Sequence, residues 1–311
     1  TTLAIIMSDN YSDAGNLELQ IAKSPQRISG MRVLKEQWKL PGKPTDLSTD
    51  AADSWRQTNF NFAEEIKLIE KGLNLEARFS ASAYTLSARN MDMAGFTTLW
   101  GRSFLTCSDI TTLIRRGGYQ SAMPLIRQAV ELIGAQEGLT NEIDMWRRWT
   151  HEAFNQESDS RAIEQKLGHY FSGESIASDT DLRIIYKAAS DFGRPNFGPS
   201  ALFVANGANR IRYPLVFADQ AFHIGWAELI FGWLMILNRK QLHLSTHLPN
   251  FFPIDEGFKQ EVIEHIQIIE EYLSDDQKCK IEEYEDKDGR PRHLMINFRR
   301  QLSDQRARLL F

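Results

Sequence analysis

Arg127 and Glu131 are the two residues of this sequence whose types and spacing most directly suggest chemistry. They follow Gly117-Gly118 and lie four positions apart, a spacing that places two side chains on one face of a helix, where they can form an ion pair. The surrounding segment is apolar on more than one face, so both charges are expected to be partly buried and must then be paired. Such a pair either clamps neighbouring helices together or belongs to a functional site.

The segment Leu113 to Glu131 resembles the core of a family of uncharacterised bacterial helical proteins, in which a turn of small residues precedes the pattern A-x-x-L-x-R-x-x-x-E. The segment Tyr186 to Asn196 resembles a second signature of that family, a Tyr-x-x-x-Ser helix end followed by His-Pro. The family is similar to HEPN-type helical bundles, some of which are RNases in defence and toxin systems. The resemblance covers roughly a third of the chain and implies a helical bundle with a polar cleft.

Five polar residues are expected to line this cleft between the central helices. In this hypothesis Arg127 and Arg194 hold an anionic group, and Glu131 fixes the position of Arg127. Ser190 and Asn196 supply hydrogen bonds. The hypothesis requires these five side chains to lie close together in the fold.

One difference from the family concerns its chemistry. Arg194 stands where the family has a histidine before proline. HEPN RNases need an Arg and a His with four to six residues between them, so that the His can act in acid–base cleavage. The nearest such pair in this chain is Arg147 with His151, where three residues intervene. The resemblance therefore supports the fold more than the RNase reaction.

The histidines suggest a separate hypothesis, a small-molecule or metal-dependent helical enzyme. His243 and His247 are four positions apart and could present two metal ligands on one helix face. A third ligand would come from elsewhere in the chain, such as His223, Glu228 or Asp219. Asp219 lies four positions before His223, and such a pair is usually a satisfied histidine in the core. We predict no cofactor; stoichiometric Zn or Fe in purified protein would favour this hypothesis.

Composition restricts the class of protein. Hydrophobic residues make up 42% of the 311 residues, enough for a substantial core, and the net charge of −5 argues against broad, non-specific nucleic-acid binding. Cys107 and Cys279 are the only cysteines, too few and too distant for a disulfide framework. Residues 1–7 lack the basic residues and the long apolar run of a signal peptide. We therefore expect a cytoplasmic protein.

The most apolar segment runs from Ile224 to Leu237 and contains Glu228. Its fourteen residues are too few to cross a bilayer, which takes about 20. We therefore predict a buried core helix and no membrane association. A helix this rich in aromatic and aliphatic side chains could also form a homodimer through a shared face.

The pattern of apolar residues predicts an all-α helical bundle with a small C-terminal β-hairpin. We expect an N-terminal arm and helix over residues 1–50, the main bundle over 51–275, and a β-hairpin with a basic tail over 276–311. The principal helices are expected over 92–116, 121–136, 180–192 and 213–244. Further helices are expected over 141–154, 160–171 and 253–273.

The C-terminal region carries an uneven charge distribution. Residues 255–288 contain thirteen acidic and four basic side chains, whereas residues 289–311 contain six Arg and one Asp. The sequence Asp288-Gly289 predicts the turn of a hairpin, and a short Arg-rich helix is expected after it. The basic tail either docks on the adjacent acidic run or on a neighbouring subunit, or it contacts RNA through Arg299, Arg300, Arg306 and Arg308.

Three functions of different classes follow from these patterns. The first is a HEPN-like bacterial protein of defence or stress that binds or cleaves RNA through the central cleft. The second is a non-catalytic oligomerising or partner-binding bundle, in which the Arg127–Glu131 pair is only structural. The third is the helical enzyme built around the histidines.

Overall fold

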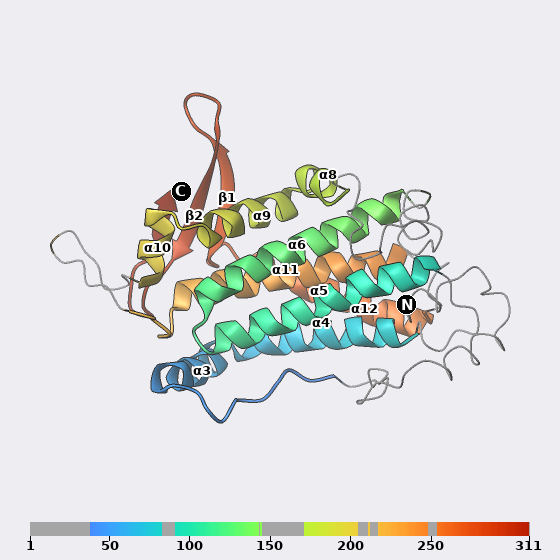
Figure 1. Cartoon of the computed structure of the whole chain (residues 1–311), viewed down its shortest axis with the longest axis horizontal. Coiled ribbons are helices and arrows are strands. Elements are labelled where there is room, and N and C mark those ends of the chain that lie inside the picture. Colours follow the sequence, from blue (N-terminus) through green and yellow to red (C-terminus); the bar gives the residue numbers. More distant parts are fainter. Residues whose placement is uncertain are drawn as a thin grey trace, which may run out of the picture.

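The computed structural model describes residues 38–82, 91–142, 144, 171–204, 211, 217–247 and 254–310. These residues form a helical bundle with a small antiparallel sheet at one end, which confirms the predicted fold class (Figure 1). Most of the expected N-terminal arm, and the helices expected over 141–154 and 160–171, lie outside the described residues. The helices are α3 (Thr49–Asn61), α4 (Ala63–Ser82), α5 (Met91–Arg115), α6 (Tyr119–Asn141), α8 (Phe171–Ser178), α9 (Thr180–Gly193), α10 (Phe197–Val204), α11 (Ile224–His247) and α12 (Glu256–Leu273).

The turn between α5 and α6 is built by Gly117 and Gly118. Gly117 adopts a positive φ of 76°, which glycine tolerates best, and its N–H bonds the carbonyl of Ile114. The N–H of Gly118 donates to the carbonyl of Leu113 over 2.8 Å, as in a Schellman cap. A Cβ atom on Gly117 would lie 2.1 Å from the carbonyl oxygen of Gln220. The predicted helix end is therefore confirmed, and only glycine fits it.

Helix α11 is the centre of the bundle. Figure 1 shows it beside α6 and α5, with the sheet at its N-terminal end. Trp226, Phe231 and Leu234 are each at most 1% exposed. The prediction of a buried core helix is confirmed, and none of the described helices has the length and apolarity needed to span a bilayer. The apolar surface of α11 that suggested a homodimer packs largely against other helices of the same chain.

The sheet contains one strand more than the sequence predicted. Strands β1 (Lys280–Glu285) and β2 (Pro291–Phe298) form the expected hairpin, with Gly289 at a φ of 71° in its turn. The prediction of an Arg-rich helix after this hairpin is wrong, because β3 (Ala307–Leu310) pairs antiparallel with β2. The free edge of β2 offers backbone hydrogen bonds that the tail satisfies as a strand.

The basic tail docks on the start of α11. The N–H of Gly225 donates to the carbonyl of Arg299 over 2.9 Å, and the guanidinium of Arg299 lies 3.8 Å from the carboxylate of Glu228. The ring of Phe298 packs edge-on against that of Trp226, 5.3 Å between centroids. The expected partner was the acidic run that begins at residue 255; Arg299 instead reaches an acidic residue inside the bundle.

Candidate functional site

Arg127, Glu131 and Tyr186 form one cluster between α6 and α9. The Nε of Arg127 lies 3.2 Å from Oε1 of Glu131, and its Nη2 donates to the phenol oxygen of Tyr186 over 3.0 Å. The guanidinium also lies 5.1 Å from the centre of the Tyr186 ring. The two segments that the resemblance singled out, 59 positions apart at these residues, thus meet through a direct hydrogen bond.

Antiparallel packing of α6 and α9 brings these residues together. Gly193, at the end of α9, lies next to Met123 in the first turns of α6, whereas Tyr186, two turns earlier on α9, reaches Arg127. The two helices therefore run in opposite directions along a common seam. Asp179 caps the N-terminus of α9 by accepting a hydrogen bond from the N–H of Leu182 over 3.0 Å.

The cluster is open to solvent on one side. The side chains of Arg127 and Glu131 are each 43% exposed, so a ligand can reach the guanidinium. Partial burial lowers the pKa of Arg127, but Tyr186 and Glu131 outweigh this effect and hold the pKa above its usual value. The group is thus a permanent cation with a fixed orientation, which suits recognition of an anionic oxygen.

The other three predicted site residues lie further along α9. Ser190 is one turn beyond Tyr186 and buried, and its hydroxyl has no hydrogen-bond partner among the described residues. Arg194 caps the end of the helix, with 64% of its side chain exposed and Asp191 at 3.8 Å. Asn196 donates to the backbone carbonyl of Asp191 over 3.4 Å. Ser190 and Arg194 therefore lie about 6 and 12 Å along the axis of α9 from Tyr186, so the five residues do not form the single cluster that the hypothesis requires.

The histidine hypothesis requires ligands that the structure keeps apart. His223 precedes the first residue of α11 and His247 is its last, so about 36 Å of helix separates them. His243 and His247 are neighbours, with ring centroids 4.3 Å apart, but Nδ1 of His247 lies 2.9 Å from the carbonyl of His243. The described residues contain no group of three or more His, Cys, Asp or Glu side chains that could hold a metal ion. The four residues proposed from the sequence cannot form one metal centre.

His223 instead forms a buried pair with Asp219. Its Nε2 lies 3.0 Å from Oδ2 of Asp219, and its backbone N–H donates to the phenol oxygen of Tyr119 over 3.2 Å. Burial lowers the pKa of His223 more than Asp219 raises it, so the ring is neutral at pH 7. Burial likewise raises the pKa of Tyr119 to about 12. As expected, His223 is a satisfied histidine in the core.

A pocket of about 240 Å³ lies beside this pair, where the α5–α6 turn meets α10 and the residues before α11. The first turn of α6 lines it through Tyr119, Gln120 and Ser121. Gly118 occupies the N-cap position and has no side chain to cap the turn. None of the five residues proposed from the sequence lines this pocket.

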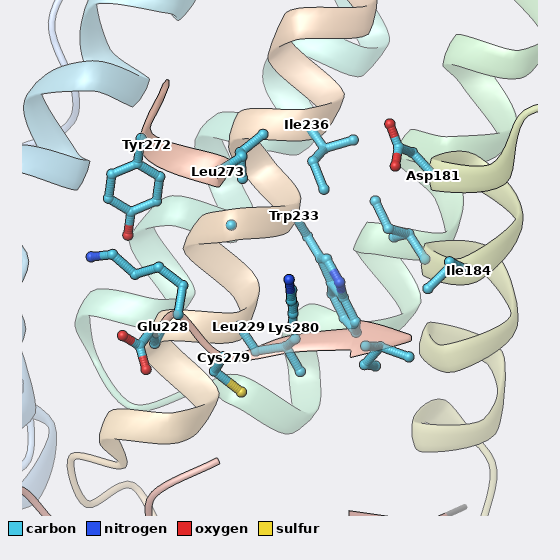
Figure 2. Close-up of a pocket in the computed structure, with 14 residues that line it drawn as sticks. Asp181, Ile184, Glu228, Leu229, Trp233, Ile236, Tyr272, Leu273, Cys279 and Lys280 are labelled. Carbon is cyan, nitrogen blue, oxygen red and sulfur yellow. The ribbon is translucent and has the colours of Figure 1, made fainter. Parts of the chain in front are cut away.

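A second pocket, of about 80 Å³, lies between α11, α9 and β1 (Figure 2). Figure 2 shows Trp233 and Lys280 side by side in it, with Asp181 at one end and Tyr272 at the other. A Cβ atom added to Gly232 would meet nothing within 4 Å, so this glycine opens the space above α11. Its lining is mostly apolar, and none of the five predicted residues contributes to it.

A network of charged groups borders this second pocket. Tyr272 and Lys278 both contact the carboxylate of Glu65, at 2.8 and 3.3 Å. Burial raises the pKa of Glu228, although Arg299 opposes the effect. The metal hypothesis gave Glu228 the role of a ligand, whereas its nearest cation is Arg299. The excess of Arg in the tail was the signal in the sequence that could have indicated this partner.

Comparison of the chain with protein-family models, with curated proteins and with solved structures finds no match.

Proposed function

We propose that this protein binds single-stranded RNA along the seam between α6 and α9, as a HEPN-like helical protein of bacterial defence or stress. The observation that carries the proposal is the hydrogen bond between Arg127 and Tyr186, which joins the two segments that resemble that family. A guanidinium held by a carboxylate and a phenol presents its remaining N–H groups in a fixed direction, as phosphate binding requires.

The distribution of groups along the seam fits a strand rather than a compact ligand. Arg127 and Arg194 supply two cations about two helical turns apart, and Tyr186 supplies an aromatic ring beside Arg127. Proteins that bind single strands combine such cations with aromatic rings on which bases stack. Asn196, exposed after α9, adds a hydrogen-bonding group of the kind that reads unpaired bases.

The proposal concerns binding, and cleavage is tested in the same samples. No histidine of the described residues contacts Arg127, and His151, the nearest candidate in the sequence, lies outside them. If the wild type cleaves the RNA, the group that acts as acid and base must lie elsewhere in the chain.

The test is fluorescence anisotropy of a labelled single-stranded RNA of mixed sequence, with DNA of the same sequence as comparison. Arg127→Ala and Arg194→Ala should each weaken binding about tenfold and lower the slope of log K against log salt by about 0.7. Arg56→Ala is the matched control, because Arg56 also pairs with a carboxylate on its own helix, Asp53. It should leave binding unchanged.

Two outcomes would contradict the proposal. In the first, wild type shows no RNA binding at low salt. In the second, Arg56→Ala weakens binding as much as Arg127→Ala, so that only net charge matters. If RNA does not bind and Glu131→Ala unfolds the protein, the Arg127–Glu131 pair is a structural clamp and a partner-binding bundle becomes the better interpretation.

A further inference from the structure

A layer of buried polar side chains crosses the middle of the bundle. It separates a large hydrophobic cluster that includes Ile110, Ile133 and Leu237 from a smaller one that includes Trp100 and Leu242. Helices α4, α5, α6 and α11 contribute to this layer, and every contributing residue is at most 3% exposed. The members are Glu76 on α4, Ser103 on α5, Gln136 on α6, and Asn238 and Gln241 on α11.

Hydrogen bonds link most of this layer. The amide nitrogen of Gln136 donates to the hydroxyl of Ser103 over 3.2 Å, and that hydroxyl donates to the carbonyl of Trp100 over 3.0 Å. The amide nitrogen of Gln241 reaches the same carbonyl over 3.2 Å. The indole N–H of Trp100 in turn donates to the backbone carbonyl of Glu76.

Glu76 is the one acidic member of the layer, and only 1% of the residue is exposed. The amide nitrogen of Asn238 donates to its Oε1 over 2.6 Å. Helices α4 and α11 approach closely here, since a Cβ atom on Gly72 would lie 2.0 Å from Oδ1 of Asn238. Among the described residues no Lys, Arg or His forms an ion pair with Glu76, whose other oxygen, Oε2, has no hydrogen-bond partner.

The carbonyl oxygen of Asn238, Oδ1, also lacks a donor among the described residues. The carboxyl group of Glu76 and the carboxamide of Asn238, which share one hydrogen bond, therefore each have one acceptor oxygen without a donor. An ionised carboxylate cannot correct this, because it only accepts, and an unpaired buried charge would be very costly. A proton on Oε2 corrects both deficits, because the O–H can donate to Oδ1.

We propose that Glu76 is held as a neutral carboxylic acid that forms a closed pair with the carboxamide of Asn238, and that loss of its proton loosens the contact between α4 and α11. The pair consists of one N–H donated to Oε1 and one O–H donated to Oδ1. The bundle thereby contains a proton-binding site at its centre, independent of the seam proposed for RNA.

The surroundings of Glu76 favour the neutral form. Burial raises its pKa to about 8, and the hydrogen bond from Asn238 opposes this only in part. Helix α5 adds the thiol of Cys107, whose own pKa is raised by burial and by Glu76. Helices α6 and α11 face the site with the neutral amides of the layer. Helix α12 carries the buried His265, whose charged neighbours are Lys71 and Glu261.

The direction of the pH dependence follows from the raised pKa. The folded state keeps the proton up to about pH 8, whereas the unfolded state releases it near its ordinary pKa of 4.5. The folded state therefore binds more protons in this window, and stability falls as the pH rises from about 4.5 to about 8. Above about pH 8 the stability that the protonated Glu76 contributes is fully lost.

The test is urea unfolding of the whole chain across this pH range, for wild type and Glu76→Gln. The amide of the variant can donate to Oδ1 and accept from the amide nitrogen, so both hydrogen bonds persist without a titrating group. The unfolding constant of wild type, divided by that of the variant, should rise about tenfold per pH unit within the window. Glu65→Gln is the control, because Glu65 is also buried on α4 but pairs with Lys278; it should not remove the pH dependence.

Parallel curves for wild type and Glu76→Gln would overturn the proposal. So would a wild type whose unfolding midpoint at neutral pH depends on added potassium or calcium, since a bound cation would then replace the proton. If Glu76→Gln fails to fold, NMR of wild type with carbon-13 labelled glutamate decides the matter. One carboxyl carbon should titrate near pH 8, and titration of every glutamate near its ordinary pKa would refute the proposal.

Discussion

The guanidinium of Arg127 on α6 donates a hydrogen bond of 3.0 Å to the phenol oxygen of Tyr186 on α9, while Glu131 holds its other side. This arrangement leaves the cation accessible, because 43% of the Arg127 side chain is exposed. An ion pair this exposed contributes at most about 1 kcal/mol to stability. We therefore expect the pair to contribute little to the stability of the fold.

The stability of Arg127→Ala separates a role in binding from a role as a structural clamp. Half-exposed ion pairs on a helix contribute about 0.3–0.5 kcal/mol, and the bond to Tyr186 adds about 1 kcal/mol. We expect the variant to lose about 1–1.5 kcal/mol in the free energy of unfolding, measured by urea denaturation. Tyr186→Phe should lose about 1 kcal/mol or less, and the double variant less than the sum of the two. A loss of several kcal/mol for Arg127→Ala would instead indicate a structural clamp.

Gly117 and Gly232 should respond in opposite ways to replacement by alanine. Gly117→Ala places a side chain at a positive φ and within 2.1 Å of the Gln220 carbonyl, so we expect a loss of about 3 kcal/mol or more. Gly232 lies inside α11 with open space above it, where alanine should stabilise the helix by about 0.5–1 kcal/mol. Thermal unfolding of the two variants checks both expectations, and a stable Gly117→Ala protein would contradict the close approach of the two segments.

His265 should make the protein sensitive to acid. Burial, aided by Lys71 and opposed by Glu261, lowers its pKa from 6.5 to about 4, and neither ring nitrogen has a hydrogen-bond partner among the described residues. Below pH 6.5 the His265 ring binds a proton in the unfolded state but not in the folded state. The stability of the protein therefore falls as the pH drops from 6.5 toward 4. His265→Leu should reduce this slope by up to about 1.4 kcal/mol per pH unit. Urea denaturation at a series of pH values measures it, and an unchanged slope would argue against a neutral, buried ring.

Arg299 should anchor the tail through Glu228. Arg299→Met removes the nearest cation from a carboxylate whose side chain is only 7% exposed, so we expect a loss of about 3 kcal/mol. Adding Glu228→Gln removes the uncompensated charge and should restore most of this loss. Arg308→Ala serves as the control, because Arg308 lies on the short edge strand β3. Equal effects of Arg299→Met alone and in combination would show that charge is not the cause.

Local signals in the sequence determined several elements of this protein. Gly117-Gly118 ended α5, Asp288-Gly289 formed the hairpin turn, and the apolar run beginning at Ile224 became the buried α11. These features depend on hydrogen bonds and conformations within a few residues, which a short segment specifies by itself. The spacing of Arg127 and Glu131 likewise predicted their ion pair, because both lie on one helix.

Only the tertiary structure decided which distant groups meet. It paired Arg127 with Tyr186, Glu76 with Asn238 and Arg299 with Glu228, and it added β3 to a predicted hairpin. It also separated His223 from His247 along one helix, although their types suggested a common site. Such contacts depend on how whole helices pack, an outcome of the summed burial of many side chains that no short segment of sequence contains.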